Sequence, residues 1–344
     1  MKTIKVLIVD DSIVFRQMLM RHFLNVPNIQ IIGYAVDAAE ARQKILQLNP
    51  DVVTLDVEMP GMSGIDFLKS FLPKHPIPII LVSSLNIRVF DALSYGAVDF
   101  IRKPEMHLSN SKDAFFSTLQ SKIVIAAQAH VRIPQAKSVE RIAPLPTGQL
   151  SHNVLSSTII GIGASTGGTE TTLEILKALP KEMPGILVTQ HMPEGFTEMY
   201  AQRLNRICRL DVKEAKHGDP ILPGQVLIAP GSFQMKVVPA QKGYVVHCVK
   251  GEKVNGHCPS VDVLFSSIAE NVSLRKVGII LTGMGRDGAE GLLKMRKKGA
   301  FTIGQDKASS VVYGMPMVAN NIGAVCVQAS YKNIASVLLK HLKQ

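Results

Sequence analysis

The first 125 residues alternate short apolar runs with segments in which apolar residues recur at helical spacing. The apolar runs, each typical of a buried strand, lie at residues 5–9, 29–35, 52–55, 77–82 and 99–101. The segments with helical spacing lie at residues 13–24, 38–48, 64–71, 87–95 and 113–127. Five strand–helix pairs in strict alternation predict a parallel sheet with helices on both faces, a flavodoxin-like (βα)5 domain.

A second α/β pattern begins near residue 155. Strands are predicted at residues 158–163, 186–190, 276–282 and 301–303, and helices at residues 170–178, 195–207, 261–271, 288–298 and 331–343. Shorter apolar runs at residues 211–215, 225–229, 234–238 and 244–249 are separated by Gly and Pro turns and predict a section of antiparallel character. The second domain is therefore expected to be doubly wound and mostly parallel, with a short antiparallel section.

The segment between these two patterns has no sustained periodicity. Residues 128–153 hold three prolines and several polar residues, which is typical of a linker. The predicted organisation is a first domain over residues 1–127, a linker over 128–153 and a second domain over 154–344.

Composition excludes several classes of protein. Apolar residues make up 46% of the chain and charged residues 19%, which excludes a disordered chain. No apolar run approaches the roughly 20 residues needed to cross a bilayer, and the N-terminus lacks the pattern of a signal peptide. Four Cys in a chain this long do not form a disulfide framework. We therefore expect a cytoplasmic protein without membrane insertion.

The net charge of +11 is unevenly placed, because residues 155–344 carry +8 of it. A basic half of this kind suits an acidic partner, either a protein or a nucleic acid. The basic residues are scattered, however, and no motif that reads DNA or RNA is present. No nucleic-acid partner is expected.

Charged and polar side chains follow four strands of the first domain. Asp10 and Asp11 follow the first strand, Asp56 the third, Ser83 the fourth and Lys103 the fifth. Because the carboxyl ends of parallel strands lie on one side of a sheet, we expect these side chains to meet there. Crowded carboxylates favour Mg²⁺, and an Asp carboxylate can accept a phosphoryl group. The amine of Lys103 would then neutralise phosphate oxygens, and the hydroxyl of Ser83 would bond one of them.

This constellation resembles the receiver domain of two-component response regulators. Residues 59–64, after the central acid, are similar to the family's loop, and Phe100 stands at its aromatic switch position. The resemblance implies that Asp56 is the phosphoacceptor and that Ser83, Phe100 and Lys103 form the switch. It also implies a Mg²⁺ site held by Asp11, Asp56 and the carbonyl of Glu58, with Asp10 nearby.

The second domain carries a G-x-S-x-G pattern between a strand and a helix, at residues 163–167. Such a turn lifts the hydroxyl of Ser165 out of the sheet edge. A nucleophilic serine needs a base and an acid that orients the base, and His191 and Asp287 also follow predicted strands. The chain order Ser, His, Asp differs from that of α/β-hydrolases, which argues against that fold but leaves the chemistry open. The glycine-rich loop at residues 283–288 offers backbone N–H groups for an oxyanion.

Two other features of this domain suggest a nucleotide site or a zinc site. Gly161 and Gly163 begin a pattern like that of a dinucleotide loop, but Thr166 stands where its third glycine belongs. The pairs His247-Cys248 and His257-Cys258 resemble zinc ligands, but adjacent strand residues point to opposite faces and no further pair completes a closed site. Neither a nucleotide nor a second metal is expected.

The second domain resembles the catalytic domain of the chemotaxis protein-glutamate methylesterases. The segments that carry the resemblance are residues 162–168, 190–192, 259–265 and 281–288, and the order receiver, linker, esterase is also that of the family. The resemblance implies a catalytic triad of Ser165, His191 and Asp287, with the Met284 backbone N–H as an oxyanion donor and no cofactor for ester hydrolysis.

The function that follows is a phosphorylation-activated methylesterase. The implied substrates are glutamate γ-methyl esters on methyl-accepting chemotaxis receptors, with deamidation of receptor glutamines as a second activity and a chemotaxis histidine kinase as phosphodonor. We expect the unphosphorylated first domain to cover the strand-end face of the second, and phosphorylation to loosen that contact. The alternative is a response regulator whose output domain is non-catalytic or binds a nucleotide.

Overall fold

The computed structural model describes residues 3–84, 88–104, 109–131 and 150–344. The chain divides into two compact units, residues 1–138 and 139–344. Most of the predicted linker, and the start of the helix expected at residue 87, lie outside the described residues. The predicted boundaries at 127 and 154 therefore stay a prediction. No helix in the described segments has the length and apolarity to cross a bilayer.

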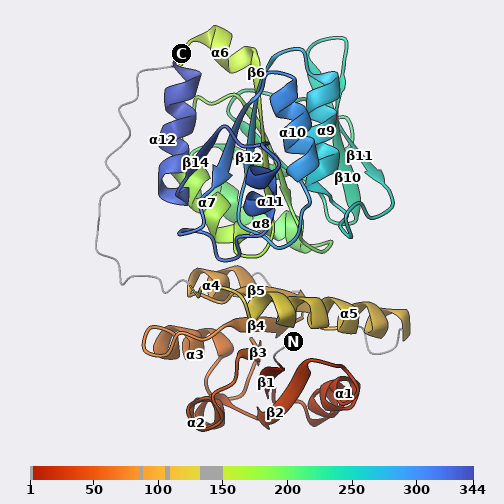
Figure 1. Cartoon of the computed structure of the whole chain (residues 1–344), viewed down its shortest axis with the longest axis vertical. Coiled ribbons are helices and arrows are strands. Elements are labelled where there is room, and N and C mark those ends of the chain that lie inside the picture. The colour runs from red at the N-terminus through yellow and green to blue at the C-terminus, as the bar shows by residue number, and fades with distance from the viewer. Residues whose placement is uncertain (1–2, 85–87, 105–108, 132–149) are drawn as a thin grey trace. The chain divides into compact units, whose positions relative to one another are not determined.

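The first unit contains one five-stranded parallel sheet (Figure 1). Its strands are β1 (Ile4–Val9), β2 (Ile29–Ala35), β3 (Val52–Asp56), β4 (Ile79–Ser83) and β5 (Asp99–Arg102). Its helices are α1 (Ile13–Phe23), α2 (Ala38–Leu48), α3 (Gly64–Phe71), α4 (Arg88–Ser94) and α5 (Ser109–Ala126). The strand order β2-β1-β3-β4-β5 is that of the flavodoxin-like fold, which confirms the predicted class. All residues of β3 and β4 are buried, as expected for central strands covered on both faces.

The second unit is built on a seven-stranded parallel sheet of order β14-β13-β12-β6-β7-β9-β8. The strands of this unit are β6 (Thr158–Ala164), β7 (Gly185–Gln190), β8 (Asp211–Glu214), β9 (Gln225–Ile228), β10 (Phe233–Pro239), β11 (Tyr244–Lys250), β12 (Arg275–Ile280), β13 (Phe301–Gln305) and β14 (Val327–Ala329). Among the four short strands expected in the antiparallel section, β10 and β11 do pair antiparallel. The other two, β8 and β9, instead run parallel as the edge of the main sheet. The doubly wound, mostly parallel class is confirmed.

The helices of the second unit pack on both faces of that sheet (Figure 1). They are α6 (His152–Ser156), α7 (Gly168–Ala178), α8 (Phe196–Ile207), α9 (Val261–Asn271), α10 (Ala289–Lys297), α11 (Met315–Asn321) and α12 (Tyr331–Leu342). Sequence reasoning missed α6, α11 and β14, which are short and lack a clear apolar period. Of these, α11 bears on the site, because its N-terminus supports the loop that follows β12.

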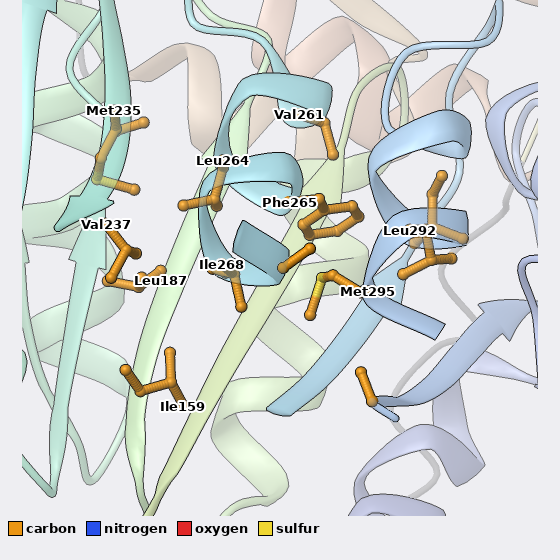
Figure 2. Close-up of a cluster of buried hydrophobic side chains, with 14 of the residues drawn as sticks. Ile159, Leu187, Met235, Val237, Val261, Leu264, Phe265, Ile268, Leu292 and Met295 are labelled. Carbon is orange, nitrogen blue, oxygen red and sulfur yellow. The ribbon is translucent and has the colours of Figure 1, made fainter. Parts of the chain in front are cut away.

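A buried apolar cluster holds α9 close to the sheet. Figure 2 shows Phe265 and Ile268 of α9 in one cluster with Leu292 of α10 and Ile159 of the sheet. Glycines in β6 allow this approach: a Cβ on Gly161 would lie 2.8 Å from Ile268 Cδ1, and one on Gly163 would lie 2.1 Å from Val261 Cγ1. These glycines therefore serve helix packing, and they bring the N-terminus of α9 next to the end of β6.

Candidate active site

Ser165 lies on the turn between β6 and α7. Its backbone N–H donates to the carbonyl of Thr282 at 3.0 Å, which ties the turn to the end of β12. Gly167, with a φ of 75°, makes the turn tight enough for α7 to begin at Gly168. The predicted strand–serine–helix arrangement is therefore present, and Ser165 is partly exposed at the sheet edge.

His191 follows β7, the strand next to β6. Its backbone N–H donates to the carbonyl of Ala164 at 3.1 Å, so it lies beside the serine turn. The side chain is 7% exposed, and its Nε2 lies 2.8 Å from Asp287 Oδ2. Because a carboxylate accepts but does not donate, Nε2 carries the proton and Nδ1 is left as an acceptor. Within the described residues Nδ1 is buried and has no hydrogen-bond partner.

Asp287 is buried in a set of hydrogen-bond donors that converge on its carboxylate. Besides His191, Oδ2 accepts from the backbone N–H of Val261 at 2.7 Å. Oδ1 accepts from the hydroxyl of Ser260 at 2.7 Å and from the backbone N–H of Asp262 at 3.2 Å. These groups belong to the start of α9, where helical N–H groups have no partner within the helix. Asp287 therefore binds the electropositive end of α9 while it orients His191.

The electrostatic consequence is a carboxylate that stays ionised. Burial by itself raises the pKa of Asp287, but the hydrogen bond and charge of His191 and the bonds from Asn255 and Ser260 outweigh it. The pKa of this carboxyl is therefore held well below its usual range. A permanently ionised carboxylate at this point holds the neighbouring imidazole in one orientation.

Asn255 joins Asp287 to a second carboxylate. Its Nδ2 donates to Asp287 Oδ1 at 3.0 Å and to Asp262 Oδ2 at 2.7 Å. Asp262 Oδ1 also accepts from the backbone N–H of Gly291 at 2.6 Å. Burial raises the pKa of Asp262 despite the Gly291 bond, and the charge of Asp287 adds to that effect. Sequence reasoning missed Asn255, although its Asn-Gly dipeptide is a strong turn signal.

The loop after β12 lies against the serine turn. A Cβ on Gly283 would lie 2.6 Å from Ser165 Cβ, which shows how closely the two backbones approach. The carbonyl of Gly283 accepts from the N–H groups of Gly314 and Met315, at 3.0 and 2.8 Å, at the start of α11. The next N–H, that of Met284, has no acceptor in the described part of the chain. A free N–H beside a serine is what an oxyanion hole needs.

The structure brings the predicted residues Ser165, His191, Asp287 and Met284 to one edge of the second unit's sheet. The His191–Asp287 bond is formed. Within the described residues no hydrogen bond joins Ser165 Oγ to the imidazole, a looseness that is common in catalytic sites without substrate.

A separate acidic cluster lies at the strand ends of the first unit. Carboxylate oxygens of Asp10, Asp11 and Asp56 all lie within 4.8 Å of one another. Asp10 and Asp56 are buried, whereas Asp11 is exposed. Lys103 Nζ lies 2.6 Å from Asp56 Oδ2 and 2.8 Å from Asp10 Oδ2. Of the five side chains predicted to meet there, these four lie together.

The electrostatics of this cluster suit a hard cation. Burial raises the pKa of Asp56, and the hydrogen bond and charge of Lys103 only partly oppose it. Burial lowers the pKa of Lys103, but its bonds to Asp10 and Asp56 outweigh that effect and raise it. The cluster thus holds one ammonium and three carboxylates. The carboxylate oxygens form a donor set that fits Mg²⁺. Glu58 is positioned by its N–H, which donates to Asp56 Oδ1 at 3.1 Å.

The other two predicted switch residues, Ser83 and Phe100, lie on the neighbouring strands β4 and β5. Ser83 ends β4, and its buried Oγ has no hydrogen-bond partner within the described segments. Phe100, on β5, is 5% exposed and packs edge-on against Phe90 of α4, with ring centroids 6.0 Å apart. A hydroxyl that lacks a partner is available to bond a group placed on Asp56.

Comparison with known proteins gives the family. Residues 160–338 match the model of the CheB methylesterase family, and residues 6–110 match that of the response regulator receiver domain. The protein-glutamate methylesterase/protein-glutamine glutaminase 2 of Syntrophomonas wolfei is 51% identical over 100% of this chain and 99% of that protein. The protein-glutamate methylesterase/protein-glutamine glutaminase of Syntrophotalea carbinolica is 44% identical over 100% of this chain and 99% of that protein.

A solved structure supports the same assignment. The crystal structure of the Thermotoga maritima CheB methylesterase catalytic domain is 36% identical, with a TM-score of 0.53, and covers 54% of this chain and 99% of that one. The chain belongs to the CheB methylesterase family and carries a response regulator receiver domain ahead of its methylesterase domain.

Proposed function

We propose that the chain hydrolyses glutamate γ-methyl esters on methyl-accepting chemotaxis receptors, and that phosphorylation of Asp56 activates it. The observation that carries this proposal is the bond between His191 and the buried, ionised Asp287, next to a serine that follows the neighbouring strand. The names of the relatives, protein-glutamate methylesterase/protein-glutamine glutaminase, supply the substrate class.

The geometry assigns a role to each group. Ser165 Oγ attacks the ester carbonyl and its proton passes to Nδ1 of His191, because Nε2 is bound to Asp287. The Met284 N–H stabilises the oxyanion that forms on the former carbonyl oxygen. The imidazolium then gives its proton to the departing methoxide, which leaves as methanol. A water molecule, activated in turn by His191, hydrolyses the acyl-enzyme.

The same steps deamidate a glutamine side chain. An amide passes through the same tetrahedral oxyanion, and His191 protonates the departing amine, so that ammonia replaces methanol as the product. The relatives' names include protein-glutamine glutaminase, which supports this second activity. Neither reaction needs a metal or an organic cofactor in this mechanism.

The receiver site supplies the regulation. A bound Mg²⁺ would be held by Asp11, Asp56 and the Glu58 carbonyl, with Asp10 nearby, and would neutralise charge during phosphoryl transfer. Asp56 accepts the phosphoryl group from a chemotaxis histidine kinase, Lys103 pairs with it, and Ser83 bonds one of its oxygens. The four cysteines are free thiols, which supports a reducing, cytoplasmic location.

The test uses the full chain and receptor membranes that carry radioactive methyl groups. With Mg²⁺ and a small phosphodonor, the wild type is expected to release labelled methanol faster than without the phosphodonor. An Asp56→Asn variant is the control, and its rate of methanol release is expected to be the same with and without the phosphodonor. If the activated wild type releases no methanol, the proposed substrate is wrong.

A further inference from the structure

A tight turn at residues 254–257 contacts both members of the His191–Asp287 pair. Val254 and His257 bond to each other through both backbone N–H groups, each at 3.0 Å, which closes the turn. The two residues between them, Asn255 and Gly256, have φ values of 52° and 83°. Positive φ at both central positions is the geometry for which Asn-Gly is preferred, so the turn is encoded locally.

The His257 ring lies flat on the His191 ring. The ring centroids are 3.6 Å apart and the planes differ by 9°. On the other side of the turn, the Asn255 amide donates to Asp287 Oδ1 at 3.0 Å. One turn therefore touches the imidazole with a ring and the carboxylate with an amide.

These two contacts supply what the His191–Asp287 bond leaves open. That bond fixes the position of Nε2, but it permits the ring to tilt about the line that joins Nε2 to the carboxylate. A flat neighbour at 3.6 Å fixes the plane of the ring, and with it the direction of Nδ1. The Asn255 bond likewise restrains the rotation of the carboxylate that Nε2 meets, together with the donors at the start of α9.

The turn is itself held by a buried amide. Gln234 of β10 is 4% exposed, and its Nε2 donates to the carbonyl of Glu252 at 2.9 Å and to that of His257 at 3.2 Å. Its Oε1 accepts from the backbone N–H of Ser260 at 2.8 Å. Gln234 thus connects the turn to the start of α9, which supplies the other donors to Asp287.

We propose that the turn of residues 254–257 is a positioning element of the esterase site, in which the His257 ring sets the plane of His191 and the Asn255 amide sets the orientation of Asp287. The inference rests on the proposed function, because it assigns a role within the same reaction. His257 and Asn255 are positioning residues: they act on the substrate only through His191 and Asp287.

The first test replaces the ring. His257→Ala removes the flat neighbour, and His257→Phe keeps a flat ring but no ring nitrogen. In methanol release by the phosphodonor-activated full chain, the Ala variant is expected to lose about tenfold or more in kcat, since small misplacements of a catalytic group are costly. Its KM should stay within about twofold of wild type, and the Phe variant should recover most of the kcat.

A matched control and a second variant complete the design. His247 lies on β11, and its ring stacks on the ring of His217 with the centroids 4.4 Å apart. His247→Ala removes this ring and is expected to leave kcat unchanged. Asn255→Gly keeps a residue suited to positive φ and removes only the amide, so it should lower kcat by about tenfold at constant KM.

The outcomes separate the two proposals. If the wild type releases no methanol, the proposed function fails. If the wild type is active and His257→Ala or Asn255→Gly matches its kcat, the positioning role is wrong. If His257→Phe is as slow as His257→Ala, the ring does not act as a flat neighbour, and the inference is overturned.

Discussion

His191 donates a hydrogen bond from Nε2 to Oδ2 of Asp287 across 96 residues of chain, at 2.8 Å. Both side chains are buried, and the carboxylate also binds the N-terminus of α9 through Val261 and Asp262. Asp287 therefore holds two elements together: the strand end that carries His191 and the helix that covers the sheet. Removal of its charge should affect both activity and stability.

The stability effect depends on pH in a defined direction. The pKa of Asp287 is lower in the folded protein than in the unfolded chain, although burial by itself acts the other way. Such a group contributes stability that is fully present above the unfolded pKa, about 3.9, and is lost as the pH falls through the folded pKa. Asp287→Asn should lower the free energy of unfolding by about 2–3 kcal/mol at pH 7.

Urea unfolding of the full chain, followed by circular dichroism, measures this effect. The difference between wild type and Asp287→Asn should stay constant from pH 7 to about pH 5 and should shrink below about pH 4. A difference that is the same at pH 3 as at pH 7 would contradict a depressed pKa at this carboxyl.

Gly314 supports the loop that carries the proposed oxyanion donor. A Cβ on this residue would lie 2.7 Å from the Gly283 carbonyl oxygen and 3.0 Å from Met284 Cα. Because these are backbone atoms, Gly314→Ala must shift the loop and with it the Met284 N–H. We expect kcat for methanol release to fall by about tenfold to a hundredfold, with little change in KM.

A glycine elsewhere in the same unit serves as the control for that variant. In Gly304→Ala the new methyl group lies 2.9 Å from the side chain of Val325 and does not touch the loop. Thermal unfolding of both variants shows how much stability each loses. The oxyanion assignment is unsupported if Gly304→Ala and Gly314→Ala lower kcat equally.

We expect Lys103 to compete with a bound metal ion for the carboxylates of the receiver site. Its ammonium lies within 2.8 Å of both Asp10 and Asp56, so Lys103→Met leaves more negative charge on the cluster. A unit charge about 4 Å away is worth at least about 1 kcal/mol. Calorimetric titration of the full chain should therefore show Mg²⁺ binding tighter by about fivefold or more in the variant.

An exposed lysine provides the comparison. Lys69 pairs with Asp66 on the surface, with both side chains about half exposed, and Lys69→Met should not change Mg²⁺ binding. Equal or weaker Mg²⁺ binding by Lys103→Met would show that this lysine does not offset the charge of the metal site.

Strand ends explain why so much of both sites was predictable. Residues that follow the strands of a parallel sheet must lie along one edge, and Ser165, His191 and Asp56 do so. What surrounds these residues depends on distant segments. The donors to Asp287 come from α9, and Gly314 belongs to a short helix that contains Pro316 and has no clear period.

The sequence pattern also does not show whether a short strand runs parallel or antiparallel to its neighbour. The strands β8 and β9 have four residues each, and an apolar run of that length looks the same in a parallel and an antiparallel pair. Gly161 and Gly163 show a related limit, since their role is to admit the side chains of α9, a contact made across about 100 residues of chain.

Ser165→Ala provides the most direct test of the account. In the phosphodonor-activated full chain, this variant should release no methanol from methylated receptor membranes, while Asp56 still takes up the phosphoryl group at the wild-type level. Methanol release by Ser165→Ala at the rate of the wild type would contradict the proposal that this hydroxyl is the nucleophile.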